Sequence, residues 1–123
     1  MYDNPSGIQP RKHLRLIITL PLKFFVDKEA VARDGMVIDV GAGGMHFESR
    51  HRFADSSALR LVFGLRPGRQ FELQARVNSV WVDLESDKVR YRVAFVTIAK
   101  HIQDEIAEFV FNSWRETLLN NDQ

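Results

Sequence analysis

The sequence predicts a small β-barrel with a helix at its C-terminal end. Between residues 14 and 98, apolar residues alternate with polar ones, which is the periodicity of strands with one buried face. After residue 100 the apolar repeat changes to one of four residues, which is typical of an amphipathic helix. A closed sheet has no exposed edges, so about six short strands can bury one core. The fold class is therefore all-β with a terminal helix.

Alternation predicts each strand in turn. The first begins at Leu14, and Pro21 ends its run, because proline cannot donate to a sheet. In the longest alternating segment, residues 71–82, the apolar positions shift by one residue after Val77. This shift predicts a bulge near Asn78 and Ser79. The predicted strands span residues 14–20, 36–40, 45–47, 59–65, 71–82 and 89–98.

The helix is predicted from five apolar residues at intervals of four, with Asp104 and Glu105 in its first turn, where acids favour the macrodipole. We expect the stripe to cover an open side of the barrel, with binding of a partner as the alternative. Phe111 lies off this stripe, which makes it, with Trp114, a candidate for partner contact. The stripe consists of Ile102, Ile106, Val110, Trp114 and Leu118.

Composition limits the class of protein. The 123 residues include no cysteine, which excludes disulfides, thiolate nucleophiles and cysteine-bound zinc. No apolar run approaches the roughly 20 residues of a spanning helix, and Met1–Pro10 has no apolar signal-peptide core. We therefore expect a cytoplasmic protein without membrane insertion. Residues 1–10 are expected to be a flexible leader and residues 11–123 a single domain.

Charge argues against a nucleic-acid-binding protein. The net charge of +1 is too small for a protein that neutralises many phosphates. Two basic and five acidic side chains give residues 100–123 a charge of −3, which leaves +4 upstream, where a compact anion would suit the arginines. Phe63 and Phe71 resemble the stacking platforms of single-strand binders, but they alternate with core positions, so packing explains them. We expect no DNA or RNA partner.

No group of residues indicates catalysis. The four histidines are scattered, and neither a nucleophile motif nor a metal-ligand spacing connects them. His46 and His51 are explained by solvation or hydrogen bonding, and the acidic stretch 83–87 by a solvated loop. We expect no enzyme, no metal and no cofactor.

Two clusters flank the first predicted strand and carry the binding chemistry. Arg11 and Arg15 can each hold a phosphate or the O6 and N7 edge of guanine with a bidentate guanidinium. Within residues 39–44, the glycines permit positive φ and expose backbone N–H groups, while Asp39 can accept from guanine N1 and N2. Together the clusters predict recognition of guanine and phosphate. Taken singly, they fit a solvated leader and a tight hairpin turn.

Arg11 and Arg15 resemble the RxxxR motif of the PilZ domain, and residues 39–44 resemble its second motif, (D/N)xSxxG. The Val80 and Trp81 pair and the final helix also resemble PilZ elements. The resemblance implies a six-stranded antiparallel β-barrel with a C-terminal helix. It implies a bacterial receptor for cyclic di-GMP that controls motility, biofilm or exopolysaccharide output. The ligand-binding residues it implies are Arg11, Arg15, Asp39, Gly41 and Gly44.

One position departs from the motif. Gly41 stands where the motif has serine, and the lost hydroxyl costs about 0.5 to 1.5 kcal/mol, or roughly tenfold in affinity. The alternative is therefore a degenerate PilZ adaptor that binds proteins without nucleotide. The resemblance also implies a downstream protein partner, such as a flagellar motor, pilus or polysaccharide synthase component. Residues 109–119 resemble the terminal helix of flagellar-brake PilZ domains.

A ligand-dependent arm is the mechanism that these features favour. We expect the leader through Arg15 to fold over cyclic di-GMP against the barrel near Asp39 and to become ordered only when the ligand is bound. A partner that recognises the ordered form would then be recruited.

Overall fold

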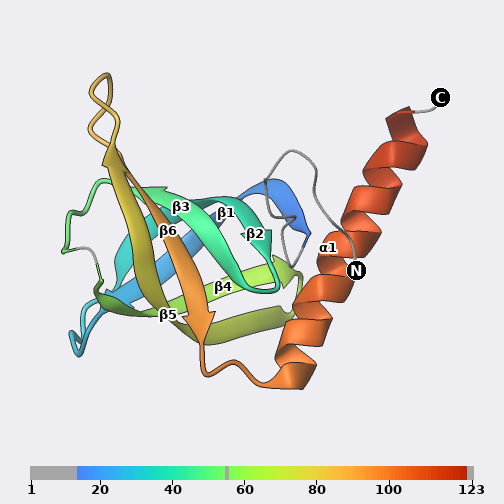
Figure 1. Cartoon of the computed structure of the whole chain (residues 1–123), viewed down its shortest axis with the longest axis horizontal. Coiled ribbons are helices and arrows are strands. Elements are labelled where there is room, and N and C mark those ends of the chain that lie inside the picture. The colour runs from blue at the N-terminus through green and yellow to red at the C-terminus, as the bar shows by residue number, and fades with distance from the viewer. Residues whose placement is uncertain (1–13, 55, 122–123) are drawn as a thin grey trace, which may run out of the picture.

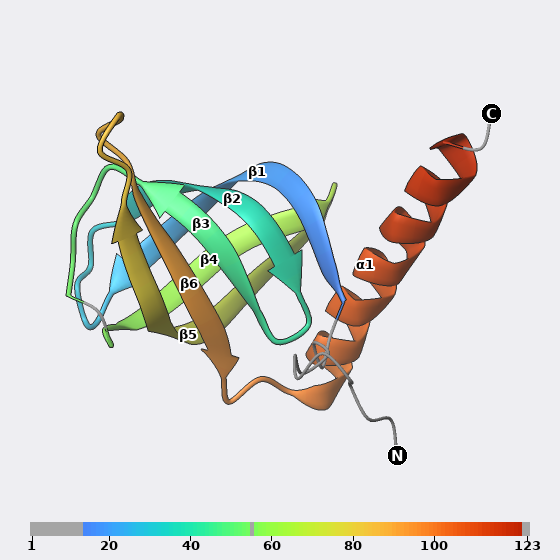
Figure 2. The same cartoon turned by 45° about the horizontal axis from the view of Figure 1, so that its top comes forward.

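Six antiparallel strands close into a barrel in the order β1-β2-β3-β6-β5-β4, and a helix lies across one end of it (Figures 1 and 2). The structure is a computed structural model, and it describes residues 14–54 and 56–121. This arrangement confirms the predicted fold class. The elements are β1 (Arg15–Val26), β2 (Arg33–Gly41), β3 (Gly44–Ser49), β4 (Ala58–Arg66), β5 (Arg69–Val82), β6 (Val89–Val96) and α1 (Lys100–Asn121).

The first strand is longer than predicted, because β1 continues through Pro21 to Val26. Pro21 pairs with Met36 of β2, while the pairing of β1 with β4 begins only at Lys23. Pro21 therefore lies where β1 has one strand neighbour, and a missing N–H is tolerated there.

The predicted bulge in β5 is confirmed. The pairing of β5 with β6 changes register between Val77 and Ser79, which is where the apolar phase shifts in the sequence. Further register shifts occur between Ile17 and Leu20 of β1 and between Val37 and Asp39 of β2. Such irregularities bend strands, and a closed six-stranded barrel requires strongly curved ones.

The core fills the barrel with the inward-facing residues of all six strands. Phe63 and Phe71 are among them, buried with ring centroids 5.6 Å apart, which confirms that packing explains these aromatic residues. Tyr91 is fully buried, and its hydroxyl donates to the carbonyl of His51 at 2.8 Å. Burial raises the pKa of Tyr91 above its ordinary value, so this hydroxyl stays protonated as a donor.

The helix is held to the barrel by apolar packing and by the ion pairs of Arg66 and Arg69 with Glu105. Ile106 and Val110 are buried, and Arg69 donates two hydrogen bonds to the Glu105 carboxylate, at 2.7 and 2.8 Å. These bonds lower the pKa of Glu105. Arg69 therefore holds α1 in place.

One expectation about α1 is wrong, and another holds only in part. The helix begins at Lys100, so Asp104 and Glu105 follow its first turn, which carries no acid. The apolar stripe covers the barrel only as far as Val110, and Trp114 and Leu118 are exposed. Among the described residues, no helix has the length and apolar composition that crossing a membrane requires.

We expect Gly44→Ala to destabilise the barrel. An added Cβ would lie 2.2 Å from the carbonyl oxygen of Val93, so β3 and β6 would have to separate. The expected loss is about 2 kcal/mol or more, measured by urea unfolding. Gly64→Ala is the matched control, because its Cβ would come no closer than 3.2 Å to a backbone oxygen. Equal losses for the two variants would contradict the account.

Candidate functional site

The outer surface of the barrel carries a row of side chains across five strands. Val40 and Met45 face the core, so their neighbours Asp39 and His46 face outward. Pairing places Ile17 beside Asp39, and Asp39 beside His46. From His46 the row continues to Arg92 and Ser79.

In this row, Asp39 lies between Arg15, which forms an ion pair with it, and His46, whose ring nitrogen is within hydrogen-bonding distance. Arg15 Nε is 3.2 Å from Asp39 Oδ1, and His46 Nδ1 is 3.3 Å from Asp39 Oδ2. The side chains of Arg15, Asp39 and His46 are only 18%, 19% and 10% exposed. The structure thus brings together one residue from each predicted cluster. Arg11 lies outside the described residues.

The glycines at the β2–β3 hairpin serve close packing. Among the described glycines, only Gly68 has a positive φ, so left-handed backbone does not explain Gly41 or Gly44. A Cβ on Gly41 would lie 2.6 Å from the carbonyl oxygen of Leu14. Glycine at this position allows β1 to approach β2 closely enough for Arg15 to reach Asp39. Gly44 is also buried, and a Cβ there would meet the carbonyl oxygen of Val93 on β6.

His46 is a site residue that the sequence reasoning did not select. Its ring centroid lies 4.7 Å from that of Trp81, whose side chain is partly exposed. Burial lowers the pKa of His46 despite the opposing effect of Asp39. The neutral tautomer that fits the Asp39 contact carries its proton on Nδ1 and leaves Nε2 as an acceptor. The register of β3 against β2 was the missing signal, because it places His46 directly beside Asp39.

Basic side chains border the site on β6. The positive charges of Arg90 and Arg92 lower the pKa of His46 further, so both lie close enough to affect it electrostatically. Glu48 partly balances Arg90, with its Oε2 3.7 Å from Arg90 Nε. The surface around Asp39 therefore has a positive potential that suits an anion.

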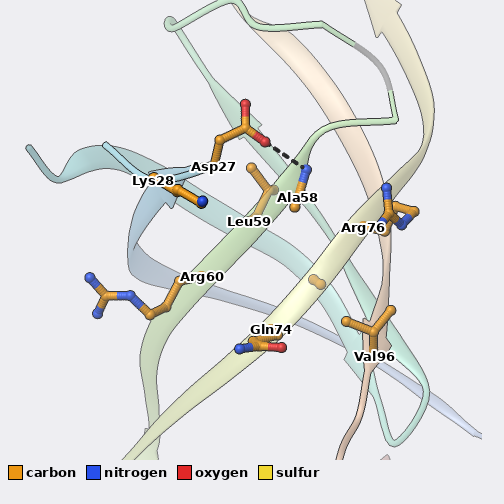
Figure 3. Close-up of a pocket in the computed structure, with 9 residues that line it drawn as sticks. Asp27, Lys28, Ala58, Leu59, Arg60, Gln74, Arg76 and Val96 are labelled. Carbon is orange, nitrogen blue, oxygen red and sulfur yellow. Dashed lines mark hydrogen bonds between the residues drawn. The ribbon is translucent and has the colours of Figure 1, made fainter. Parts of the chain in front are cut away.

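A second candidate site is a cavity of about 440 Å³ on another side of the barrel, bordered by β4 and β5. Two arginines line this cavity, Arg60 and Arg76, and their guanidinium groups point away from each other (Figure 3). Arg60 lies over the ring of Phe25 at 3.9 Å, and Arg76 donates to the carbonyl of Ser56 at 3.1 Å. These arginines are engaged within the protein and do not converge on one position, so the Asp39 surface is the better anion site.

The part of the chain that the structure describes forms no metal site. Within residues 14–54 and 56–121, no three side chains among His, Cys, Asp and Glu gather as a metal ion would require. The contact between His46 and Asp39 is therefore a hydrogen-bonding pair.

Comparison with known proteins gives a consistent result. The family model of the PilZ domain matches residues 9–112. The PilZ domain of YcgR from Escherichia coli, solved with c-di-GMP, superposes with a TM-score of 0.68 at 17% identity, covering 94% of this chain and 99% of that one. The Bacillus subtilis inhibitor of motility MotI/DgrA gives a TM-score of 0.74 at 22% identity, with 89% of this chain covered. This chain spans only 53% of MotI/DgrA. No curated protein matches by sequence.

We expect acid to destabilise the protein through His46. Since burial lowers the pKa of His46 below its ordinary 6.5, the unfolded chain binds a proton more readily than the folded one. The stability that neutral His46 contributes is fully present above pH 6.5. It is lost as the pH decreases towards the pKa of His46 in the folded state. His46→Gln removes this titration, so its melting temperature should fall less between pH 7.5 and about 5.5. His101→Gln, an exposed position on α1, is the control. An unchanged pH dependence in His46→Gln would contradict this assignment.

Proposed function

This chain belongs to the PilZ domain family, and we propose that it is a bacterial cyclic di-GMP receptor whose ligand binds on the barrel surface around Asp39. PilZ domains are binding and adaptor domains rather than enzymes. The observation that carries the proposal is the 3.2 Å contact between Arg15 and Asp39, which joins the two motifs in space. The c-di-GMP-bound PilZ domain of YcgR, with which this chain shares its fold, supports the choice of ligand.

The chemistry of the site suits this ligand. Cyclic di-GMP has two guanines and two phosphates, so its recognition needs positive charge, an acceptor for guanine N1 and N2, and flat surfaces. Arg15 supplies the planar guanidinium, and Asp39 supplies the acceptor. Arg90 and Arg92 add positive potential for the phosphates.

Trp81 supplies a stacking surface in this proposal. Trp81 is 38% exposed, and its ring lies against that of His46, the cross-strand neighbour of Asp39. A base that stacks on an aromatic ring gains about 1 to 3 kcal/mol. Ile17 is exposed on the other side of Asp39 and offers a second apolar contact.

The missing serine lowers the expected affinity. Because a Cβ at Gly41 would meet the carbonyl oxygen of Leu14 at 2.6 Å, the site as it stands has no space for a hydroxyl there. One lost hydrogen bond weakens binding about tenfold. The Arg15 and Asp39 pair remains to bind the nucleotide.

Signalling would follow from the arm that precedes β1. We propose that Arg11, in the segment before Arg15, contributes to the same ligand and that residues 5–15 become protected from amide exchange when it binds. The protein would act in the cytoplasm on motility, biofilm or exopolysaccharide output through a downstream partner. Unchanged exchange protection with saturating ligand would contradict the arm mechanism.

A nucleotide-independent adaptor is the second candidate. Gly41 favours it, as do the exposed apolar side chains Phe111 and Trp114 of α1. A partner captured equally well with and without cyclic di-GMP would support this alternative over the receptor.

Calorimetric titration tests the receptor directly. We expect cyclic di-GMP to bind the intact chain and both Arg15→Ala and Asp39→Asn to weaken binding by roughly 10- to 100-fold, because each removes a hydrogen bond involving a charged group. Arg76→Ala is the matched control, since its guanidinium is engaged with Ser56 at the other cavity. Absence of binding heat with the intact chain at any accessible concentration would reject the receptor function.

A further inference from the structure

The helix carries a second apolar stripe, separate from the side that contacts the barrel. Ile106 and Val110 face the barrel and are buried. At 3.6 residues per turn, the centre of a row of four exposed residues lies about 90° around the helix axis from the midpoint of Ile106 and Val110. This outer stripe consists of Ala107, Phe111, Trp114 and Leu118.

The spacing of the outer stripe is that of a helix-pairing surface. Its residues follow one another at intervals of four, three and four, as in the seam of a coiled coil. A helix that only covers a barrel needs one apolar side and has polar residues opposite. The C-terminal half of α1 extends beyond the strands in both views, which leaves the stripe open to a partner (Figures 1 and 2).

We propose that the outer stripe packs antiparallel against the outer stripe of a second copy of this chain and forms a twofold-symmetric dimer. In this pairing Phe111 faces Trp114 of the second copy, and Leu118 faces Ala107 of the second copy. Each copy uses the same surface, so the assembly closes at two. The dimer is an inference independent of cyclic di-GMP binding.

Charge complementarity selects a second copy and the antiparallel direction. Glu108 and Arg115 are both exposed and flank the outer stripe on the same side, seven residues apart. Antiparallel pairing brings Glu108 of each copy opposite Arg115 of the other, which makes two symmetric ion pairs. Parallel pairing places Glu108 level with Glu108, and Arg115 level with Arg115, so opposite charges do not meet.

The exposed area predicts a weak dimer. Phe111, Trp114 and Leu118 are 46%, 43% and 45% exposed. At about 150 to 250 Å² for a whole aromatic side chain, two copies offer roughly 500 Å² of apolar surface. Stable complexes bury about 1,200 Å² or more in total, so even with a polar rim we expect dissociation in the micromolar range.

Sedimentation equilibrium of the nucleotide-free 123-residue chain tests the proposal. We expect the mass to rise from 14.2 kDa towards twice that value as the concentration increases from about 1 to 500 μM. Glu108→Arg and Arg115→Glu should each weaken dimerisation about tenfold, and the double variant should restore it to within about threefold. Phe111→Lys should abolish it.

Matched controls lie away from the outer stripe and from the flank that carries Glu108 and Arg115. Glu116→Arg makes the same charge change as Glu108→Arg on another side of the helix, and Leu84→Lys removes an exposed apolar residue in the turn between β5 and β6. Both should leave the dimer unchanged, as should Arg15→Ala, which affects only the nucleotide site. A chain that stays monomeric at every concentration overturns the proposal, because the stripe then serves a different partner. A dimer insensitive to the charge reversals, or not restored by the double variant, overturns it too.

Discussion

The close approach of β1 to β2 at Gly41 is the constraint on which the candidate site depends. Gly41 has no side chain, so the backbone of Leu14 can pass within a distance that any Cβ would obstruct. The next residue, Arg15, is thereby placed with its Nε 3.2 Å from the Asp39 carboxylate. The residue that departs from the family motif is therefore also the one that permits this contact. The chain thus has a tightly packed arginine and carboxylate beside the position where the motif has a serine.

The barrel supplies two further conditions for the site. Alternation along β3 directs Met45 and Phe47 into the core and leaves His46 outside beside Asp39. The bulge between Val77 and Ser79 changes the register of β5 against β6 just before Trp81 reaches the His46 ring. The site is thus made by strand register across five strands rather than by one loop. Rigid strands suit the proposed receptor function, because they would hold a small ligand in one orientation.

Much of the fold could be predicted from sequence because strand alternation and the β5 bulge are local patterns. The course of β1 beyond Pro21 could not, since tolerance of that proline depends on where the neighbouring strand β4 begins. The extent of the contact between α1 and the barrel could not be predicted either. The helix's stripe at intervals of four continues to Leu118, but the barrel ends near Val110, so only the three-dimensional extent of the barrel separates core from surface.

The site was predictable to the extent that it lies in motifs. Arg15 and Asp39 were identified as a pair, and the structure brings them together. The close approach of Leu14 to Gly41 was not predicted, because a sequence does not show which backbone passes over a glycine. His46 was missed because its importance arises from cross-strand pairing. The pairing of Arg66 and Arg69 with Glu105 could not be predicted either, because Glu105 lies on a helix far along the chain.

The most direct test of the central claim is an NMR titration of the ¹⁵N-labelled chain with cyclic di-GMP. The account predicts that the amide signals of Arg15, Asp39 and His46 and the indole signal of Trp81 shift together with one binding curve. The signals of Arg60 and Arg76, at the other cavity, should not move. Shifts centred on Arg60 and Arg76, or no shifts at millimolar nucleotide, would contradict it.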